Sequence, residues 1–208
     1  MIIDVYQDTI CPWCRIGKAN LFSALAKWEG ADSVTLRWHA FQLDPTTPAE
    51  GRDFNQSMVA KMGGPERLKQ IFGQVTQAGA ASGLHFDFDK VTRMPNTLLS
   101  HQLISLAPEE MKLKLIDAIY QAYFEDGRDI GSLDVLVAIA EELQIDGAKL
   151  REQLEANEAL EAVKADLASA QDYAIRGVPY FILDGKLAVS GAQAADGFMS
   201  ALMQAAEA

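Results

Sequence analysis

The chain has 208 residues, of which 49% are hydrophobic and 23% are charged, an ordinary composition for a globular protein with a sizeable core. Its 29 acidic and 18 basic residues give a formal net charge of −11, which argues against nucleic acid and against an anionic membrane surface as partners. The sequence contains no run of about 18 apolar residues, so we expect no membrane-spanning helix.

The chain begins with Met1 directly before an apolar segment, without the basic and apolar regions of a secretory signal. We therefore expect a cytoplasmic protein. In that reducing compartment a cysteine pair is more often catalytic than structural.

The first elements predict a β-α-β unit. The apolar run 2–6 indicates a strand, and the polar residues 7–9 after it indicate a turn. Apolar residues then recur at helical spacing through 16–26. Residues 33–41 alternate between apolar and polar side chains, as a second strand does.

Cys11 and Cys14, the only cysteines, lie where the first strand gives way to the first helix. Unpaired backbone N–H groups and the positive end of the helix dipole would favour a thiolate at Cys11. Cys14 lies one turn further in and is expected to be more shielded. The pair predicts dithiol redox chemistry, with Cys11 as the attacking sulfur and Cys14 as the resolving sulfur. Pro12 and Trp13 lie between them, where the reduction potential is tuned.

Other interpretations of the cysteines are weaker. A structural zinc site normally needs four ligands, and the chain adds only the scattered His39, His85 and His101, so we expect no metal. A disulfide across so short a loop would remove little chain entropy. Two inert, buried cysteines remain an alternative, although Pro12 and Trp13 fit a helix start better than a packed interior. His39 and His101 are interpreted as hydrogen-bonded structural residues.

After a break at 44–48, residues 53–174 have helical periodicity almost throughout. One helix shows a clear apolar stripe, formed by Ile116, Ile119, Tyr120, Tyr123 and Phe124. A single exposed helix is expected over 150–167, where Glu, Ala and Lys are abundant.

Strand character returns only near the C-terminus. Residues 180–183 and 187–189 are apolar, and Asp184-Gly185 between them is a hairpin signal. A last helix is predicted over 194–205.

This order, β-α-β, then helices, then β-β-α, predicts an α/β fold with one mixed sheet and a large all-helical insertion. Neither strand group is large enough to form a stable sheet alone, so the two are expected to join. The predicted domains are 1–45 with 175–208 for the sheet, and 46–174 for the insertion.

Pro179 directly precedes the returning strand, a position that proline tolerates because it cannot donate to the sheet. A strand start is therefore a sufficient explanation of Pro179 taken alone. Beside a dithiol, a cis Val178–Pro179 bond is the better interpretation, because its turn would leave the Val178 backbone free to pair with an extended substrate near Cys11.

Four segments together resemble the DsbA-like branch of the thioredoxin superfamily, and within it the FrnE-type proteins related to 2-hydroxychromene-2-carboxylate isomerases. These segments are 8–17, which holds both cysteines, 95–101, 177–181 and 189–193. The resemblance implies a thioredoxin-like mixed sheet with a helical insertion, a cis-proline opposite the dithiol, and thiol–disulfide oxidoreductase activity. It also implies that Asn96 lines the groove that faces Cys11, and the alternative is that Pro95 and Asn96 form an ordinary turn and helix cap.

The expected function is therefore a thiol–disulfide oxidoreductase that acts on protein or low-molecular-weight disulfides and needs no cofactor beyond its own redox-active disulfide. An alternative is a glutathione-dependent isomerase or transferase, because the isomerases and the kappa-class glutathione transferases resemble this architecture and use glutathione. Those proteins carry serine at the position of Cys11, so the intact cysteine pair favours the redox function. A third hypothesis is a chaperone-like binding module that does not depend on the cysteines.

Overall fold

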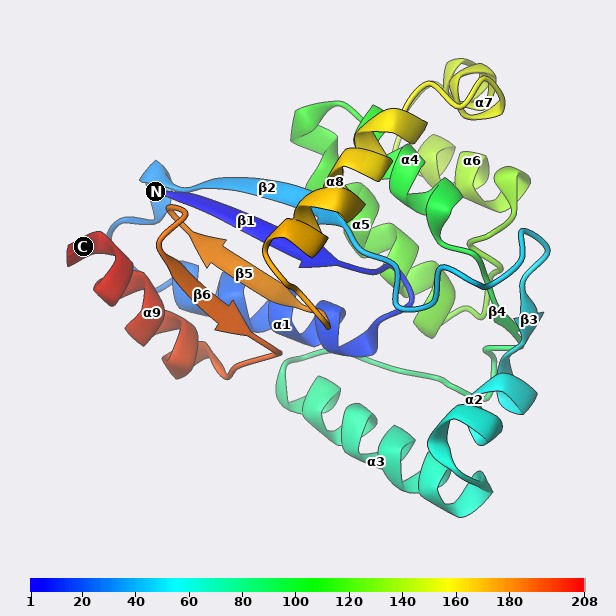
Figure 1. Ribbon diagram of the computed structural model, residues 1–208, viewed down its shortest axis with the longest axis horizontal. Coiled ribbons are helices and arrows are strands. Elements are labelled where there is room, and N and C mark those ends of the chain that lie inside the picture. Colours follow the sequence, from blue (N-terminus) through cyan, green and yellow to red (C-terminus); the bar gives the residue numbers. More distant parts are fainter. Residues whose placement is uncertain (208) are drawn as a thin grey trace. The chain divides into compact units, whose positions relative to one another are not determined.

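The structure is a computed structural model that describes residues 1–207. The chain forms two compact units (Figure 1). The first unit comprises Met1–Leu43 and the residues from Asp166 onward, and the second comprises Asp44–Ala165. Helix α8 (Leu160–Asp172) runs across the second boundary.

A four-stranded mixed sheet is the centre of the first unit. Its order is β2 (Thr35–Ala40), β1 (Ile2–Gln7), β5 (Tyr180–Leu183) and β6 (Leu187–Ser190). β1 is parallel to β2 and antiparallel to β5, and β5 is antiparallel to β6. The predicted mixed α/β sheet, assembled from both ends of the chain, is thus confirmed.

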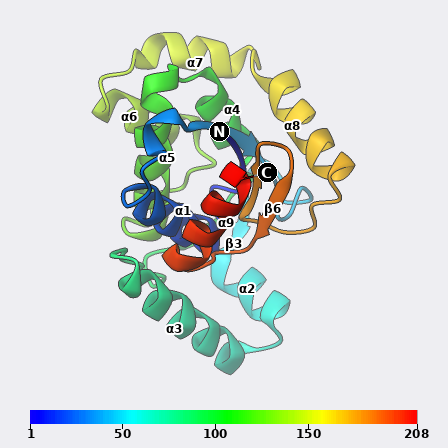
Figure 2. The same cartoon turned by 90° about the vertical axis from the view of Figure 1, so that its left-hand side faces the viewer.

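The two faces of this sheet differ, because successive side chains of a strand point to opposite faces. Ile3 and Val5 of β1 belong to the core that includes α1 (Pro12–Leu25) and α9 (Ala195–Glu207). These two helices lie side by side in both views (Figure 1, Figure 2). Tyr6 belongs to a smaller cluster on the opposite face, with Ala170 of α8.

The β5–β6 hairpin turns at Asp184 and Gly185, as predicted. Both residues have left-handed backbones, with φ of 49° and 67°, which is the conformation that favours an Asp-Gly pair. Asp184 also accepts a hydrogen bond from the Ile2 amide at 2.6 Å, which ties the turn to the start of β1.

The second unit is helical apart from one short strand pair. Its helices are α2 (Phe54–Met62), α3 (Pro65–Ala81), α4 (Leu98–Leu106), α5 (Glu109–Phe124), α6 (Leu133–Glu142) and α7 (Gly147–Glu155). The apolar stripe predicted in α5 is buried. β3 (Arg52–Asp53) and β4 (Arg93–Met94) pair antiparallel, and this ladder was not predicted because two residues are too few to show alternation.

The single helix expected over 150–167 is wrong, because the structure ends α7 at Glu155 and begins α8 at Leu160. Asn157 between them has a φ of 55°, a left-handed conformation that asparagine tolerates at a helix C-terminus. The residues on both sides of Asn157 favour a helix, so the sequence pattern did not reveal the break between α7 and α8. None of the helices in residues 1–207 combines the length and apolarity needed to cross a membrane.

Candidate active site

The dithiol lies at the junction of β1 and α1. Cys11 is the N-cap residue of α1, with an extended backbone, and its amide donates to the Asp8 carbonyl oxygen at 3.0 Å. Pro12 follows at the first helical position, where its missing N–H costs nothing because that amide has no partner within the helix. The Cys14 amide donates to the Cys11 carbonyl oxygen at 3.1 Å, so the two cysteines are one helical turn apart.

Both cysteines are free thiols and almost equally buried, with 3% of Cys11 and 2% of Cys14 exposed. Cys14 was predicted to be the more shielded sulfur, and the structure gives it only slightly less exposure than Cys11. The short turn between β1 and α1 packs both sulfurs inside, so exposure does not distinguish them.

The surroundings of Cys14 favour its protonated form. Burial raises the pKa of the Cys14 thiol well above its ordinary value, and a hydrogen bond and the charge from Cys11 raise it further. The charge of Asp8 acts in the same direction, whereas a hydrogen bond with the Asp8 backbone opposes it. Cys14 is therefore a thiol that keeps its proton in the reduced protein.

Asp8 is a component of the site that sequence reasoning missed. Residues 7–9 were interpreted only as a polar turn, yet the Asp8 side chain is fully buried. Its carboxylate accepts a hydrogen bond from the Leu43 amide at 2.8 Å, while its carbonyl oxygen holds the Cys11 amide. The sequence signal that could have identified Asp8 is an acidic residue three positions before Cys11.

The Val178–Pro179 segment lies beside Cys11. The peptide bond between these two residues is cis, and the Cys11 thiol donates to the Val178 carbonyl oxygen with 3.6 Å between sulfur and oxygen. The Pro179 carbonyl oxygen accepts from the Gly191 amide at 2.9 Å, which continues the β5–β6 pairing. The structure thus brings Cys11, Cys14, Val178 and Pro179 together in the first unit.

Gly17 allows α1 to approach this segment closely. A Cβ atom added at Gly17 would lie 2.9 Å from Cγ of Pro179 and 3.3 Å from Cζ of Phe181, closer than side chains normally pack. Glycine within a helix is unfavourable relative to alanine, so this close packing gives a reason for its presence.

Gly17→Ala is therefore expected to destabilise the protein, even though alanine favours the helix by about 1 kcal/mol. The added methyl group displaces Pro179, and such overpacking costs about 1–3 kcal/mol. We expect a net loss of about 1 kcal/mol in the free energy of unfolding in urea, together with slower disulfide reduction. Gly73→Ala is the matched control, because Gly73 also lies within a helix and a Cβ there meets nothing within 4 Å. That variant is expected to be as stable as the wild type or slightly more so.

The remaining predicted site residues lie in different surroundings. Trp13 is 38% exposed at the start of α1, while Pro12 is partly buried. Asn96 lies in the second unit, where its side-chain amide donates to the Thr47 carbonyl oxygen at 2.6 Å and its Oδ1 accepts from the Leu98 amide at 2.9 Å. Asn96 thus supports the start of α4, and its contact with substrate stays a prediction.

Within residues 1–207, no group of three or more His, Cys, Asp or Glu side chains is arranged to hold a metal ion.

The chain matches known proteins along almost its whole length. Residues 2–203 match the family described as the DSBA-like thioredoxin domain. The uncharacterized protein YwbO of Bacillus subtilis is 30% identical over 204 residues, which cover 96% of this chain and 94% of YwbO.

Two solved structures show the range of relatives. A probable DsbA oxidoreductase from Streptomyces coelicolor superposes with a TM-score of 0.91 and 31% identity, over 100% of this chain and 90% of that chain. The cytosolic disulfide reductase DsbM from Pseudomonas aeruginosa, solved with GSH, has a TM-score of 0.68 and 19% identity over the full length of both chains, a likeness of fold. From the family match, the chain belongs to the DSBA-like thioredoxin domain family, whose fold points to an oxidoreductase or isomerase.

Proposed function

We propose that this protein is a thiol–disulfide oxidoreductase in which Cys11 attacks a substrate disulfide and Cys14 resolves the mixed disulfide. The observation that carries the proposal is the pair of free thiols at the start of α1, of which Cys14 is held protonated. A helix N-terminus favours a thiolate through its unpaired amides and its dipole, and Cys11 is the N-cap residue.

The proposed reaction has two exchange steps. The Cys11 thiolate attacks one sulfur of the substrate disulfide, forming a bond to that sulfur and releasing the other as a thiolate. Cys14 then loses its proton and attacks the sulfur of Cys11, which releases the second substrate thiolate. The substrate gains two electrons, the protein is oxidised to a Cys11–Cys14 disulfide, and an external thiol restores the dithiol.

The electrostatics of Cys14 fit this order of events. The charge of Cys11 is one cause of the raised pKa of Cys14. In the mixed disulfide Cys11 is neutral, so that cause is removed and the pKa of Cys14 falls. Cys14 is thus easier to ionise at the stage when it must attack.

Two groups beside the dithiol suit a polypeptide substrate. The Val178 carbonyl oxygen now accepts from the Cys11 thiol, and it would become free to accept from a substrate amide once Cys11 is in a mixed disulfide. The exposed Trp13 offers an apolar surface next to the attacking sulfur. We include Asn96 among the substrate contacts on the basis of sequence resemblance.

Reduction of insulin by dithiothreitol tests the proposal. The protein at catalytic amounts should accelerate the appearance of insulin turbidity without added glutathione, and protein whose thiols have been alkylated should not. Equal rates with native and alkylated protein would exclude the oxidoreductase function.

Added glutathione distinguishes the alternative function. A glutathione-dependent isomerase or transferase would require glutathione for activity and would keep that activity in Cys14→Ala, because no resolving step is needed. DsbM, solved with GSH, shares the fold and makes glutathione the appropriate thiol for this comparison.

A further inference from the structure

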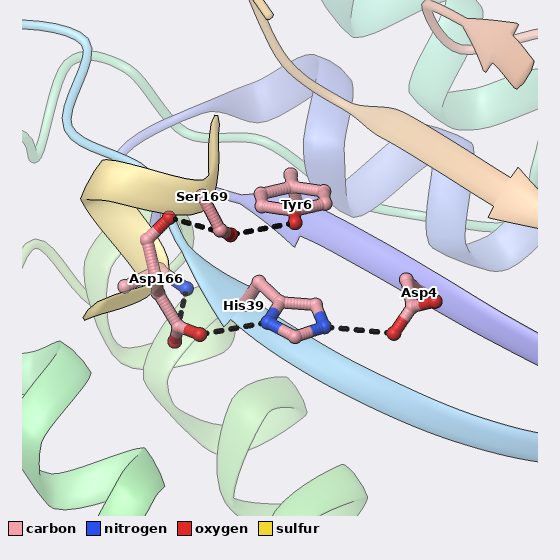
Figure 3. A network of polar contacts seen from close by, with 6 residues as sticks. Asp4, Tyr6, His39, Asp166 and Ser169 are labelled. Atoms are coloured by element: carbon pink, nitrogen blue, oxygen red, sulfur yellow. Dashed lines mark hydrogen bonds and ion pairs between the residues drawn. The ribbon is translucent and has the colours of Figure 1, made fainter. Parts of the chain in front are cut away.

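A charged clamp lies on the face of the sheet that carries Tyr6, away from the dithiol helix α1. His39 of β2 is held between two carboxylates, with its Nε2 2.9 Å from Asp4 Oδ1 and its Nδ1 2.7 Å from Asp166 Oδ1 (Figure 3). Asp4 belongs to β1 and Asp166 to α8, so the clamp joins two strands and a helix. The three side chains are only 21–27% exposed.

The geometry fits a protonated imidazole. A neutral histidine has one N–H, and an ionised carboxylate can only accept, so both contacts are hydrogen bonds only if His39 is an imidazolium. Burial lowers the pKa of His39, but the hydrogen bonds and charges of Asp166 and Asp4 outweigh it and raise the pKa above its ordinary value.

Other groups around His39 also hold α8 in place. Tyr6 stacks on the imidazole at 4.7 Å between ring centroids, and its hydroxyl lies 2.8 Å from Ser169 Oγ of α8. Asp166 accepts a second hydrogen bond, at 2.9 Å, from the Ala40 amide of β2. Tyr173 lies edge-on to Tyr6 at 6.3 Å, and Arg37 of β2 lies opposite Asp4 in the β1–β2 register, on the same face of the sheet as His39.

The end of α8 determines where the chain approaches Cys11. The amides of Tyr173, Ala174 and Ile175 donate to carbonyl oxygens of Ser169, Gln171 and Ala170, so this segment continues directly from the clamped turn. Ile175 is buried in the same cluster as Tyr6 and Ala170. Three residues later, the Val178 carbonyl oxygen reaches the Cys11 sulfur.

We propose that His39 is a positioning residue whose charged clamp on Asp4 and Asp166 fixes the segment 173–179, and that substrate binding at the dithiol weakens when this imidazolium loses its proton. The inference rests on the proposed function, because it concerns the Val178 segment that would receive the substrate. It predicts that substrate binding depends on pH through His39, which lies on the opposite face of the sheet from α1.

The direction of the effect follows from the raised pKa of His39. The clamp contributes its full stability below the unfolded-state pKa, about 6.5, and that contribution is lost as the pH rises through the higher pKa of the folded state. Loosening of the segment 173–179 is therefore expected as the pH rises above about 6.5 and through the raised pKa of His39. Loss of one charge-assisted hydrogen bond in the clamp should raise KM for insulin by about three- to tenfold.

The test compares wild type, His39→Gln and the control His85→Gln from about pH 6 to about pH 9. It measures KM and kcat for insulin, and hydrogen-exchange protection factors of the Tyr173 and Ile175 amides, with the Lys186 amide of the β5–β6 hairpin as an internal reference. As the pH rises, wild type and His85→Gln should both show lower protection of the Tyr173 and Ile175 amides and a higher KM for insulin. His39→Gln should show low protection and a high KM at every pH, with its kcat changed less than its KM.

An active His39→Gln protein with wild-type KM and wild-type protection at every pH would overturn the clamp proposal. If that variant does not fold, the exchange profile of the wild type still decides the proposal, because constant protection through the titration of His39 would overturn it. Failure of the wild type to reduce insulin at any pH would instead overturn the proposed function. The dithiol is the same in all three proteins, so a change in rate that is common to them does not mimic the effect of His39.

Discussion

Replacing Cys14 with serine is expected to stop turnover while leaving the first attack intact, so that a mixed disulfide accumulates on Cys11. The serine hydroxyl cannot attack the sulfur of Cys11, and insulin reduction should fall by about 10²-fold or more. With 5,5′-dithiobis(2-nitrobenzoate), the wild type should release about two equivalents of coloured thiolate per chain and Cys14→Ser about one. Mass spectrometry of Cys14→Ser should find the other half of the reagent attached.

Cys11→Ser is the counterpart that identifies the attacking sulfur. Burial is the largest cause of the raised pKa of Cys14 and remains in this variant although the charge of Cys11 is lost, so Cys14 should still react slowly and form little adduct. If Cys11→Ser formed the adduct as fast as Cys14→Ser does, the assignment of the two sulfurs would be reversed. If Cys14→Ser turned over insulin at the wild-type rate, the two-step exchange would be wrong.

The sheet could be predicted from the sequence because three of its strands are short apolar runs and the fourth, β2, alternates between apolar and polar side chains. Ile3 and Val5 face the core with α1 and α9, while Asp4 and Tyr6 alternate with them. The position of the dithiol could also be predicted from the sequence, because a strand, a turn and a helix start are local patterns. Proline after Cys11 marks the first helical residue independently of any distant contact.

The parts that the sequence did not predict depend on tertiary surroundings. His39 was interpreted as a structural histidine, and only the fold reveals that residues 35 and 127 positions away along the chain hold its two ring nitrogens. The burial of Asp8 beside Cys14 likewise follows from the packing of the turn. Asn157 ends a helix whose neighbours in sequence all favour helix, so a single residue with a left-handed backbone outweighed the local composition.

Phe198→Ala is expected to cause the largest loss of stability, because Phe198 is the aromatic anchor of α9 on the sheet. Its ring is 1% exposed and lies edge-on to Phe181 of β5, with 4.8 Å between ring centroids. Truncation of a buried phenylalanine costs about 3–5 kcal/mol through lost burial and the cavity left behind. The urea midpoint of unfolding should fall accordingly, with little change in its slope.

Met203→Ala on the same helix is the matched control. Its side chain is 53% exposed, so its removal should change the free energy of unfolding by no more than about 0.5 kcal/mol. The contrast separates packing from helix propensity, because both substitutions introduce the same residue into α9. Phe181 packs against Phe198 and also lies next to Gly17, where an added Cβ would be 3.3 Å from its Cζ. Loss of the Phe198 ring therefore also loosens the packing around Gly17. Equal stability of the two variants would mean that α9 is not anchored through this aromatic pair.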